Sequence, residues 1–328
     1  PSPDFFFAGG ADTLPAMIDA TKSAPATDQG FTDIRRDGWA MRLCPRALRP
    51  YALLARLDRP IGTWLLLFPC WWSLLLAPAP LSWETLWFAA LFAVGAVVMR
   101  GAGCTVNDIL DRRFDAMVER TRGRPIPSGL VTVRQALVFL ALQLLTGLIV
   151  LLQFNWTAVA LGAGSLILVF TYPLMKRVTW WPQAFLGLAF NWGALMGWAA
   201  ATGDVGWPAI ILHVAGIAWT LGYDTIYAHQ DKEDDARIGV KSTALRLGDR
   251  SKIWIYAFYT LTFTGVVLAG RLAGMGLWFS LAAGLAGAQL AWQVGTWRPD
   301  DQGDCLEKFR SNRWFGWLTL AALALGRI

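Results

Sequence analysis

Long apolar blocks dominate the sequence and constrain its fold more than any other feature. The chain is 55% hydrophobic and only 16% charged, and segments of about 17–25 mostly apolar residues are long enough to cross a bilayer as helices. Because lipid offers no hydrogen-bond partners, each segment must satisfy its own backbone as a helix. The sequence therefore predicts an all-α integral membrane protein with about nine transmembrane helices, at residues 61–78, 84–105, 134–152, 156–174, 181–201, 207–228, 253–270, 274–296 and 313–326.

The distribution of Lys and Arg predicts how these helices are oriented. Basic residues collect before the first apolar segment and in the loops after the second, fourth, sixth and eighth, whereas the opposite loops contribute almost only Arg271. Since loops rich in Lys and Arg stay on the cytoplasmic side, we expect the N-terminus and these loops to face the cytoplasm. The formal charge of +6 is then a signal of topology, and nucleic acid is not an expected partner.

Residues 1–45 differ in composition from the remainder of the chain. They carry scattered Asp, Gly, Pro and Thr, and they lack the apolar core of a secretory signal. Their Asp residues also argue against a mitochondrial presequence, which is poor in acidic residues. We expect residues 1–45 to form a disordered or interfacial extension and residues 46–328 to form the transmembrane domain. The expected location is a bacterial inner membrane, with the matrix side of the mitochondrial inner membrane as the alternative.

Two acidic clusters at the ends of apolar segments indicate a chemical function. They read Asn107-Asp108-x-x-Asp111-x-x-x-Asp115 and Asp224-x-x-Tyr227-x-x-x-Asp231-x-x-Asp234-Asp235. Carboxylates are costly near lipid and usually mark function there. Because residues three, four and seven apart share a helix face, the carboxylates of one cluster repel each other unless a cation compensates. Oxygen donors without clustered His or Cys suit Mg²⁺, which takes one or two carboxylates and adds water and phosphate oxygens. Salt bridges to Arg112 and Arg113 are the alternative for the first cluster.

The two clusters also reveal a weak internal repeat. The first follows the second apolar segment and the other follows the sixth, so the same chemistry recurs after four helices. Internal repeats in membrane proteins often place the binding site at the interface between the repeats. We therefore expect two four-helix halves plus a ninth helix, arranged around a central cavity that opens to the cytoplasmic face and brings the clusters together.

Basic residues near the clusters are candidate ligands of a diphosphate. Lys176 and Arg177 form an isolated pair at the end of the fourth apolar segment, where cationic groups could stabilise a diphosphate as a leaving group. Anchoring at the membrane edge is the alternative role of this pair. Further candidates are Arg120, Arg124 and Lys241. A diphosphate handled at a membrane surface, by a site walled with Leu, Phe and Trp, suggests an isoprenoid diphosphate.

The motifs resemble those of a known family. The segment from Asn107 to Asp115, continued through Glu119-Arg-Thr-Arg-Gly-Arg-Pro125, resembles the first signature of the UbiA-type intramembrane prenyltransferases. Tyr223-Asp-Thr-Ile-Tyr-Ala-His-Gln-Asp231-Lys-Glu-Asp-Asp235, with Gly239-Val-Lys-Ser-Thr-Ala244, resembles the second. Two further segments are similar to the 4-hydroxybenzoate polyprenyltransferase branch: Arg56-Leu-Asp-Arg-Pro-Ile-Gly-Thr-Trp64 and Tyr172-Pro-Leu-Met-Lys-Arg177. The resemblance covers about residues 50–328 and includes the nine-helix plan.

The resemblance implies an aromatic prenyltransferase of ubiquinone biosynthesis. Such an enzyme transfers a polyprenyl group from polyprenyl diphosphate to the ring carbon ortho to the hydroxyl of 4-hydroxybenzoate and releases diphosphate. The cofactor is Mg²⁺, for which the implied ligands are Asn107, Asp111, Asp231 and Asp235, with Asp108 and Asp115 in support. Lys176 and Arg177 are implied to bind the diphosphate. Tyr227 is a further candidate for substrate binding. Asp224 or another carboxylate is the candidate proton acceptor, and Arg56 or Arg59 is the candidate cation for the aromatic carboxylate, with anchoring at the membrane edge as the alternative.

Two other functions stay open from the sequence. A protein of the same fold could act on another aromatic or quinone-precursor acceptor, and the carboxylates could bind ions in a cation or metabolite transporter. Transport sites usually lie near the bilayer midplane, whereas these clusters lie at helix ends, which favours the enzyme. Beyond its two substrates and the lipid bilayer, no obligatory protein partner is expected.

Overall fold

The computed structural model describes residues 42–117 and 121–328. Within these ranges the chain forms only helices and connecting loops, with no strand, which confirms the all-α prediction. Most of the extension predicted at residues 1–45 lies outside the described residues, and so does Arg120.

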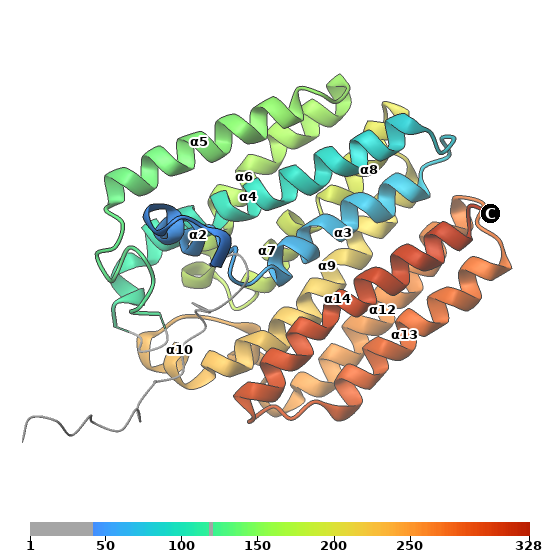
Figure 1. The fold of residues 1–328 in the computed structure, drawn as a ribbon. Coiled ribbons are helices and arrows are strands. Elements are labelled where there is room, and N and C mark those ends of the chain that lie inside the picture. The colour runs from blue at the N-terminus through green and yellow to red at the C-terminus, as the bar shows by residue number, and fades with distance from the viewer. Residues whose placement is uncertain (1–41, 118–120) are drawn as a thin grey trace, which may run out of the picture.

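Long helices run side by side along a bundle (Figure 1). A shorter pair, α7 (Pro182–Phe190) and α8 (Gly193–Thr202), takes the place of one long helix. Each of the nine apolar segments expected from the sequence coincides with one long helix or with this pair. The long helices are α3 (Ile61–Leu76), α4 (Trp83–Asp115), α5 (Val133–Leu151), α6 (Trp156–Val178), α9 (Trp207–Ala228), α12 (Ser251–Leu272), α13 (Leu277–Thr296) and α14 (Gln302–Leu325). The short elements are η1 (Arg46–Leu48), α2 (Arg49–Leu54), η2 (His229–Asp231), α10 (Lys232–Ile238), α11 (Thr243–Leu247) and η3 (Gly248–Arg250).

The lengths and compositions of these helices identify a multi-pass membrane protein. In the described part of the chain, six stretches are long and apolar enough to cross a bilayer, and α3 is a shorter apolar helix. One of them, α5, has only 17% of its most apolar stretch buried within the protein. The side chains of Leu137, Leu142 and Leu145 on this helix are at least half exposed. Such a surface suits contact with lipid. Nine crossings and a cytoplasmic orientation stay predictions.

The break between α7 and α8 was not expected from the sequence. The side-chain amide of Asn191 donates to the carbonyl of Gly187 at 2.9 Å and to the hydroxyl of Thr220 on α9 at 2.8 Å. An Asn side chain that bonds the preceding turn competes with the regular backbone pattern of a helix. A Cβ at Gly216 would collide with Asn191, so this glycine is needed for α9 to approach the break.

The acidic clusters lie at one end of the bundle, together with α2 and α10 (Figure 1). Helix α4 continues beyond its apolar segment to Asp115, so the first cluster lies on the helix itself. The second cluster extends from the last turns of α9 through η2 into α10. Helix α9 is largely buried, with Trp219, Tyr223 and Ile226 in the main hydrophobic core against α3, α12 and α14. The core therefore holds the helix that carries the second cluster.

Candidate active site

A cavity of about 850 Å³ brings both acidic clusters together. Its walls come from α3–α9, from η2, α10 and the segment that follows α10, from the turn between α2 and α3, and from the loop after α4. We call the part lined by the clusters and their basic partners the charged end, and the apolar lining residues of α4, α5 and α6 the apolar arm. Every predicted site residue that the structure describes lines it: Arg56, Arg59, Asn107, Asp108, Asp111, Asp115, Arg124, Lys176, Arg177, Asp224, Tyr227, Asp231, Asp235 and Lys241.

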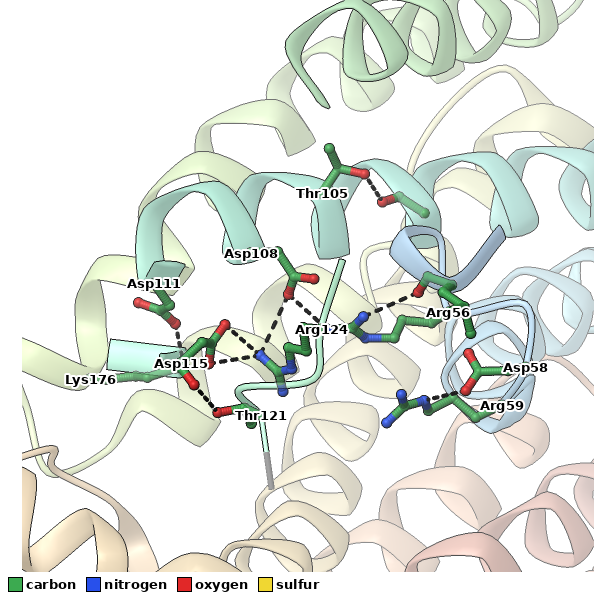
Figure 2. A network of polar contacts seen from close by, with 12 residues as sticks. Arg56, Asp58, Arg59, Thr105, Asp108, Asp111, Asp115, Thr121, Arg124 and Lys176 are labelled. Carbon is green, nitrogen blue, oxygen red and sulfur yellow. Dashed lines mark hydrogen bonds and ion pairs between the residues drawn. The ribbon is translucent and has the colours of Figure 1, made fainter. Parts of the chain in front are cut away.

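The first acidic cluster is neutralised by arginines from two other segments (Figure 2). Asp108 is fully buried, and its Oδ1 accepts a hydrogen bond of 2.7 Å from Arg56. Arg124, in the loop after α4, approaches the same oxygen at 3.5 Å and donates to both oxygens of Asp115 at 2.9 and 3.0 Å. Arg112, which the sequence offered as a partner, instead donates to the carbonyl of Ile109. The positive charges that compensate the carboxylates of this cluster therefore come from residues outside α4.

The end of α6 contacts the middle of the first cluster. The ammonium group of Lys176 lies 2.9 Å from Oδ2 of Asp111, and Arg177 lies 3.3 Å from its Oδ1. The Arg177 guanidinium also lies over the ring of Phe114, 4.9 Å from its centroid. The backbone N–H of Lys241 donates to the carbonyl of Lys176 at 3.0 Å. The ammonium group of Lys241 donates to the carbonyl of Val178 at 3.2 Å, so of these three predicted diphosphate ligands only Lys176 and Arg177 contact the first cluster.

The second cluster is supported from behind by α14. The ring of Tyr227 packs on Phe309 with centroids 4.5 Å apart, and the side-chain amide of Gln302 donates to the carbonyl of Gln230 at 3.0 Å. Asp224 lies one turn before Tyr227 on α9 and faces the cavity. This packing holds the end of α9 in place, and the carboxylates of both clusters line the same cavity.

Sequence reasoning missed one cation in the cavity, Arg100. It lies within the apolar part of α4, and its guanidinium lies over Phe190, 5.5 Å from the ring centroid. Its Nε is buried and has no hydrogen-bond partner among the described residues. A Cβ at Gly62 would collide with that nitrogen, so the glycine leaves room for the guanidinium. The position of Arg100 inside an apolar segment could have identified it, because an Arg inside a membrane span usually faces a polar cavity.

Arg56 and Arg59, the two arginines predicted for the aromatic carboxylate, contact carboxylates of the protein itself. Arg56 binds Asp108, and the Nε of Arg59 donates to Asp58 at 3.1 Å. Both arginines line the cavity near its charged end. Arg100 lies deeper along α4, at the level of the apolar segment.

The oxygen donors at the charged end fit Mg²⁺ together with a phosphate ligand. Across residues 42–117 and 121–328, no three His, Cys, Asp or Glu side chains converge into a complete metal cage. Mg²⁺ needs no such cage, because it binds one or two carboxylates and takes the remaining ligands from water and phosphate. The Oδ2 of Asp108 is a buried acceptor with no hydrogen-bond partner in the described part of the chain, so acceptor capacity is left at this end of the cavity.

Curated relatives have closely similar sequences. The mitochondrial 4-hydroxybenzoate polyprenyltransferase of Arabidopsis thaliana is 52% identical over 296 residues, which covers 90% of this chain and 72% of the relative. The human protein of the same name is 48% identical over 286 residues, covering 87% and 77%. The 4-hydroxybenzoate geranyltransferase 1 of Lithospermum erythrorhizon is 48% identical over 296 residues, covering 90% and 95%.

Solved structures and a family model agree with these relatives. The apo structure of a UbiA homologue from Aeropyrum pernix K1 has a TM-score of 0.70 at 24% identity and covers 81% of this chain and 98% of that one. A UbiA homologue from Archaeoglobus fulgidus bound to DMAPP and Mg²⁺ has a TM-score of 0.63 at 18% identity, with coverage of 84% and 97%. The model of the UbiA prenyltransferase family matches residues 66–325. The chain therefore belongs to the UbiA prenyltransferase family.

Proposed function

We propose that this protein is a Mg²⁺-dependent 4-hydroxybenzoate polyprenyltransferase. The observation that carries the proposal is the single cavity in which both acidic clusters and the Lys176–Arg177 pair adjoin an apolar arm. That combination suits a substrate with a charged diphosphate and a long hydrocarbon tail. The names of relatives about 50% identical to this chain support 4-hydroxybenzoate as the acceptor.

At the charged end, the basic residues would bind the diphosphate and stabilise it as it leaves. Lys176, Arg177, Arg124 and Lys241 line this end of the cavity, and fixed cations in a site shielded from water are effective at stabilising developing negative charge. Mg²⁺, held by Asn107, Asp111, Asp231 and Asp235, would supply further neutralisation of the leaving group. Asp108 and Asp115 would keep Arg124 in position, since both contact it.

The apolar arm would hold the prenyl chain. Leu144, Leu148 and Leu151 of α5 and Val169 of α6 line it. Burying hydrocarbon there positions the first carbon of the chain beside the diphosphate-binding residues. An apolar wall also keeps water away from an allylic cation, which would otherwise be hydrolysed.

The acceptor would lie between the charged end and Arg100. The guanidinium of Arg100 would bind the carboxylate, because Arg100 lines the cavity and charged hydrogen bonds are strong in a buried site. Cleavage of the C1–O bond releases diphosphate and leaves an allylic cation, which the ring carbon ortho to the hydroxyl attacks to form the new C–C bond. The proton on that carbon then passes to a base and aromaticity is restored. Asp224, which also lines the cavity, is the base we propose.

For the compartment, we propose the mitochondrial inner membrane with the active site on the matrix side. The relatives named above from Arabidopsis thaliana and human are designated mitochondrial, which favours this alternative over the bacterial inner membrane that the acidic N-terminal residues suggested.

An assay of prenyl transfer in purified membranes tests the proposed function. Geranyl diphosphate and 4-hydroxybenzoate are supplied with Mg²⁺ or with EDTA, and 3-geranyl-4-hydroxybenzoate is measured. We expect product only with Mg²⁺. Product formation that persists in EDTA contradicts the metal assignment, and product from a naphthoate or homogentisate but not from 4-hydroxybenzoate contradicts the acceptor.

A further inference from the structure

Gly103 on α4 faces the cavity in a way that helix packing does not explain. A Cβ built at this position has no heavy atom within 4 Å, although the residue lines the cavity. Gly101, only two positions earlier, differs: a Cβ there would lie 3.1 Å from the side chain of Ala55, so that glycine permits a close contact. A glycine inside a helix costs about 1 kcal/mol relative to alanine. Packing against a neighbouring helix therefore does not account for the missing side chain at Gly103.

Gly103 lies between Arg100, the proposed ligand of the acceptor carboxylate, and Asn107, a proposed ligand of Mg²⁺ at the diphosphate site. Residues three, four and seven apart share a helix face, which places Arg100, Gly103 and Asn107 along the same side of α4. At a rise of 1.5 Å per residue, Arg100 and Asn107 are about 10 Å apart along the helix axis. A single benzene ring with a carboxylate and a hydroxyl in para positions fits lengthwise into such an interval.

The other walls at this level make the space a slot. The guanidinium of Arg100 lies over the ring of Phe190, and Tyr172 of α6 and Asp224 of α9 line the same cavity. Aromatic faces suit a flat ring, and Asp224 is the proposed base. The open side of the slot is the surface of α4 at Gly103, where a side chain would occupy the space that the ring needs.

We propose that Gly103 determines acceptor specificity, because the absence of a side chain there creates the space in which a single aromatic ring lies between Arg100 and the diphosphate site. This inference rests on the proposed function and deepens it: the acceptor is a monocyclic aromatic carboxylate bound parallel to α4. Bulk at position 103 narrows the slot for the acceptor and leaves the α5 and α6 residues of the apolar arm unchanged.

The test compares Gly103→Ala and Gly103→Val with a matched control, Gly164→Val. Gly164 lies on α6, a Cβ there also meets no atom within 4 Å, and the residue does not line the cavity. KM is measured separately for 4-hydroxybenzoate and for geranyl diphosphate, and thermal unfolding in detergent checks the fold. Adding bulk to a site that the bound substrate already fills typically weakens binding by about tenfold to a hundredfold. We expect the KM for 4-hydroxybenzoate to rise about tenfold with Ala and more with Val, while the KM for geranyl diphosphate and the control variant stay near the unmodified values.

Each contrary result overturns a distinct statement. If the unmodified protein prenylates 4-hydroxybenzoate and Gly103→Val does so with unchanged KM, the inference fails and the proposed function stands. A rise in the KM for geranyl diphosphate instead assigns the space to the prenyl chain and likewise overturns the inference. If the unmodified protein gives no product from 4-hydroxybenzoate, the proposed function fails and this inference fails with it. Gly103→Ala keeps the test decisive if the Val variant unfolds, because alanine favours helix.

Discussion

Arg56 donates a hydrogen bond of 2.7 Å to Asp108 from a backbone whose φ is 58°. This left-handed conformation is uncommon for a residue other than glycine. The two side chains are 8% and 0% exposed, so the ion pair is withdrawn from solvent. The contact fastens the turn after α2 to the first acidic cluster, although 52 positions separate the two residues.

Replacing Arg56 should therefore destabilise the fold strongly. Arg56→Met leaves the buried carboxylate of Asp108 with only the longer contact to Arg124, and removing one partner of a buried ion pair typically costs about 3–5 kcal/mol. Thermal unfolding in detergent should show a clear drop in Tm for Arg56→Met and little change for Arg46→Met, because Arg46 is exposed. Since apolar replacement of a whole buried pair is often tolerated, the double variant Arg56→Met with Asp108→Leu should recover stability. An unchanged Tm in Arg56→Met contradicts the structural role of the pair.

Replacing Lys176 should weaken catalysis far more than stability. Its ammonium group lies at the charged end of the cavity beside Asp111, where it would neutralise the departing diphosphate. Loss of one such stabilising group typically costs about 10²–10³ in kcat, so Lys176→Met should lower prenyl transfer by about that factor. Lys252→Met is the control, because Lys252 does not line the cavity and its ammonium group donates to the carbonyl of Trp297 at the end of α13. Normal kinetics in Lys176→Met would leave anchoring at the membrane edge as its role.

Neutralising the proposed metal ligands should abolish turnover and leave the fold intact. Asp111→Asn and Asp231→Asn keep the shape of each side chain but remove a carboxylate charge, and metal-assisted charge stabilisation is worth several kcal/mol. We expect at least about a hundredfold loss of activity and a higher Mg²⁺ requirement in any residual activity. EDTA should have the same effect on the unmodified protein. Asp249→Asn, at an exposed residue of η3, is the control. Full activity in either cavity variant contradicts the magnesium assignment.

Adding one methyl group at Gly62 should affect the acceptor without unfolding the protein. The new Cβ would collide with Nε of Arg100, whose long side chain can move away. Displacing the guanidinium weakens a charged hydrogen bond to the acceptor carboxylate, worth about 1.5–3 kcal/mol, so the KM for 4-hydroxybenzoate should rise tenfold or more in Gly62→Ala. Gly284→Ala on α13, where a Cβ meets no atom within 4 Å, should leave KM unchanged. An unaltered KM in Gly62→Ala argues against Arg100 as the carboxylate ligand.

The sequence predicted the positions of the long helices well and their ends less well. The length of an apolar segment predicts where a helix can cross lipid, but such a segment ends at the first charged residues even where the helix continues. The first cluster was therefore placed after a segment that ends at residue 105. In the structure α4 continues to Asp115, because charged side chains do not interrupt backbone hydrogen bonds. The break between α7 and α8 escaped notice for a related reason: it depends on contacts of Asn191 with Thr220 on another helix.

The sequence by itself determined that the chain is a helical membrane protein and that its carboxylates recur in two motifs, since hydropathy and helical spacing are local properties. Only the tertiary structure decided which charges meet. It paired Asp111 with Lys176, and Asp108 with Arg56 in place of the neighbouring Arg112. It also placed Arg100 in the cavity and left the surface of Gly103 open. These relationships depend on how helices distant in sequence pack against one another, because the energy of an ion pair follows the distance between the charges in space.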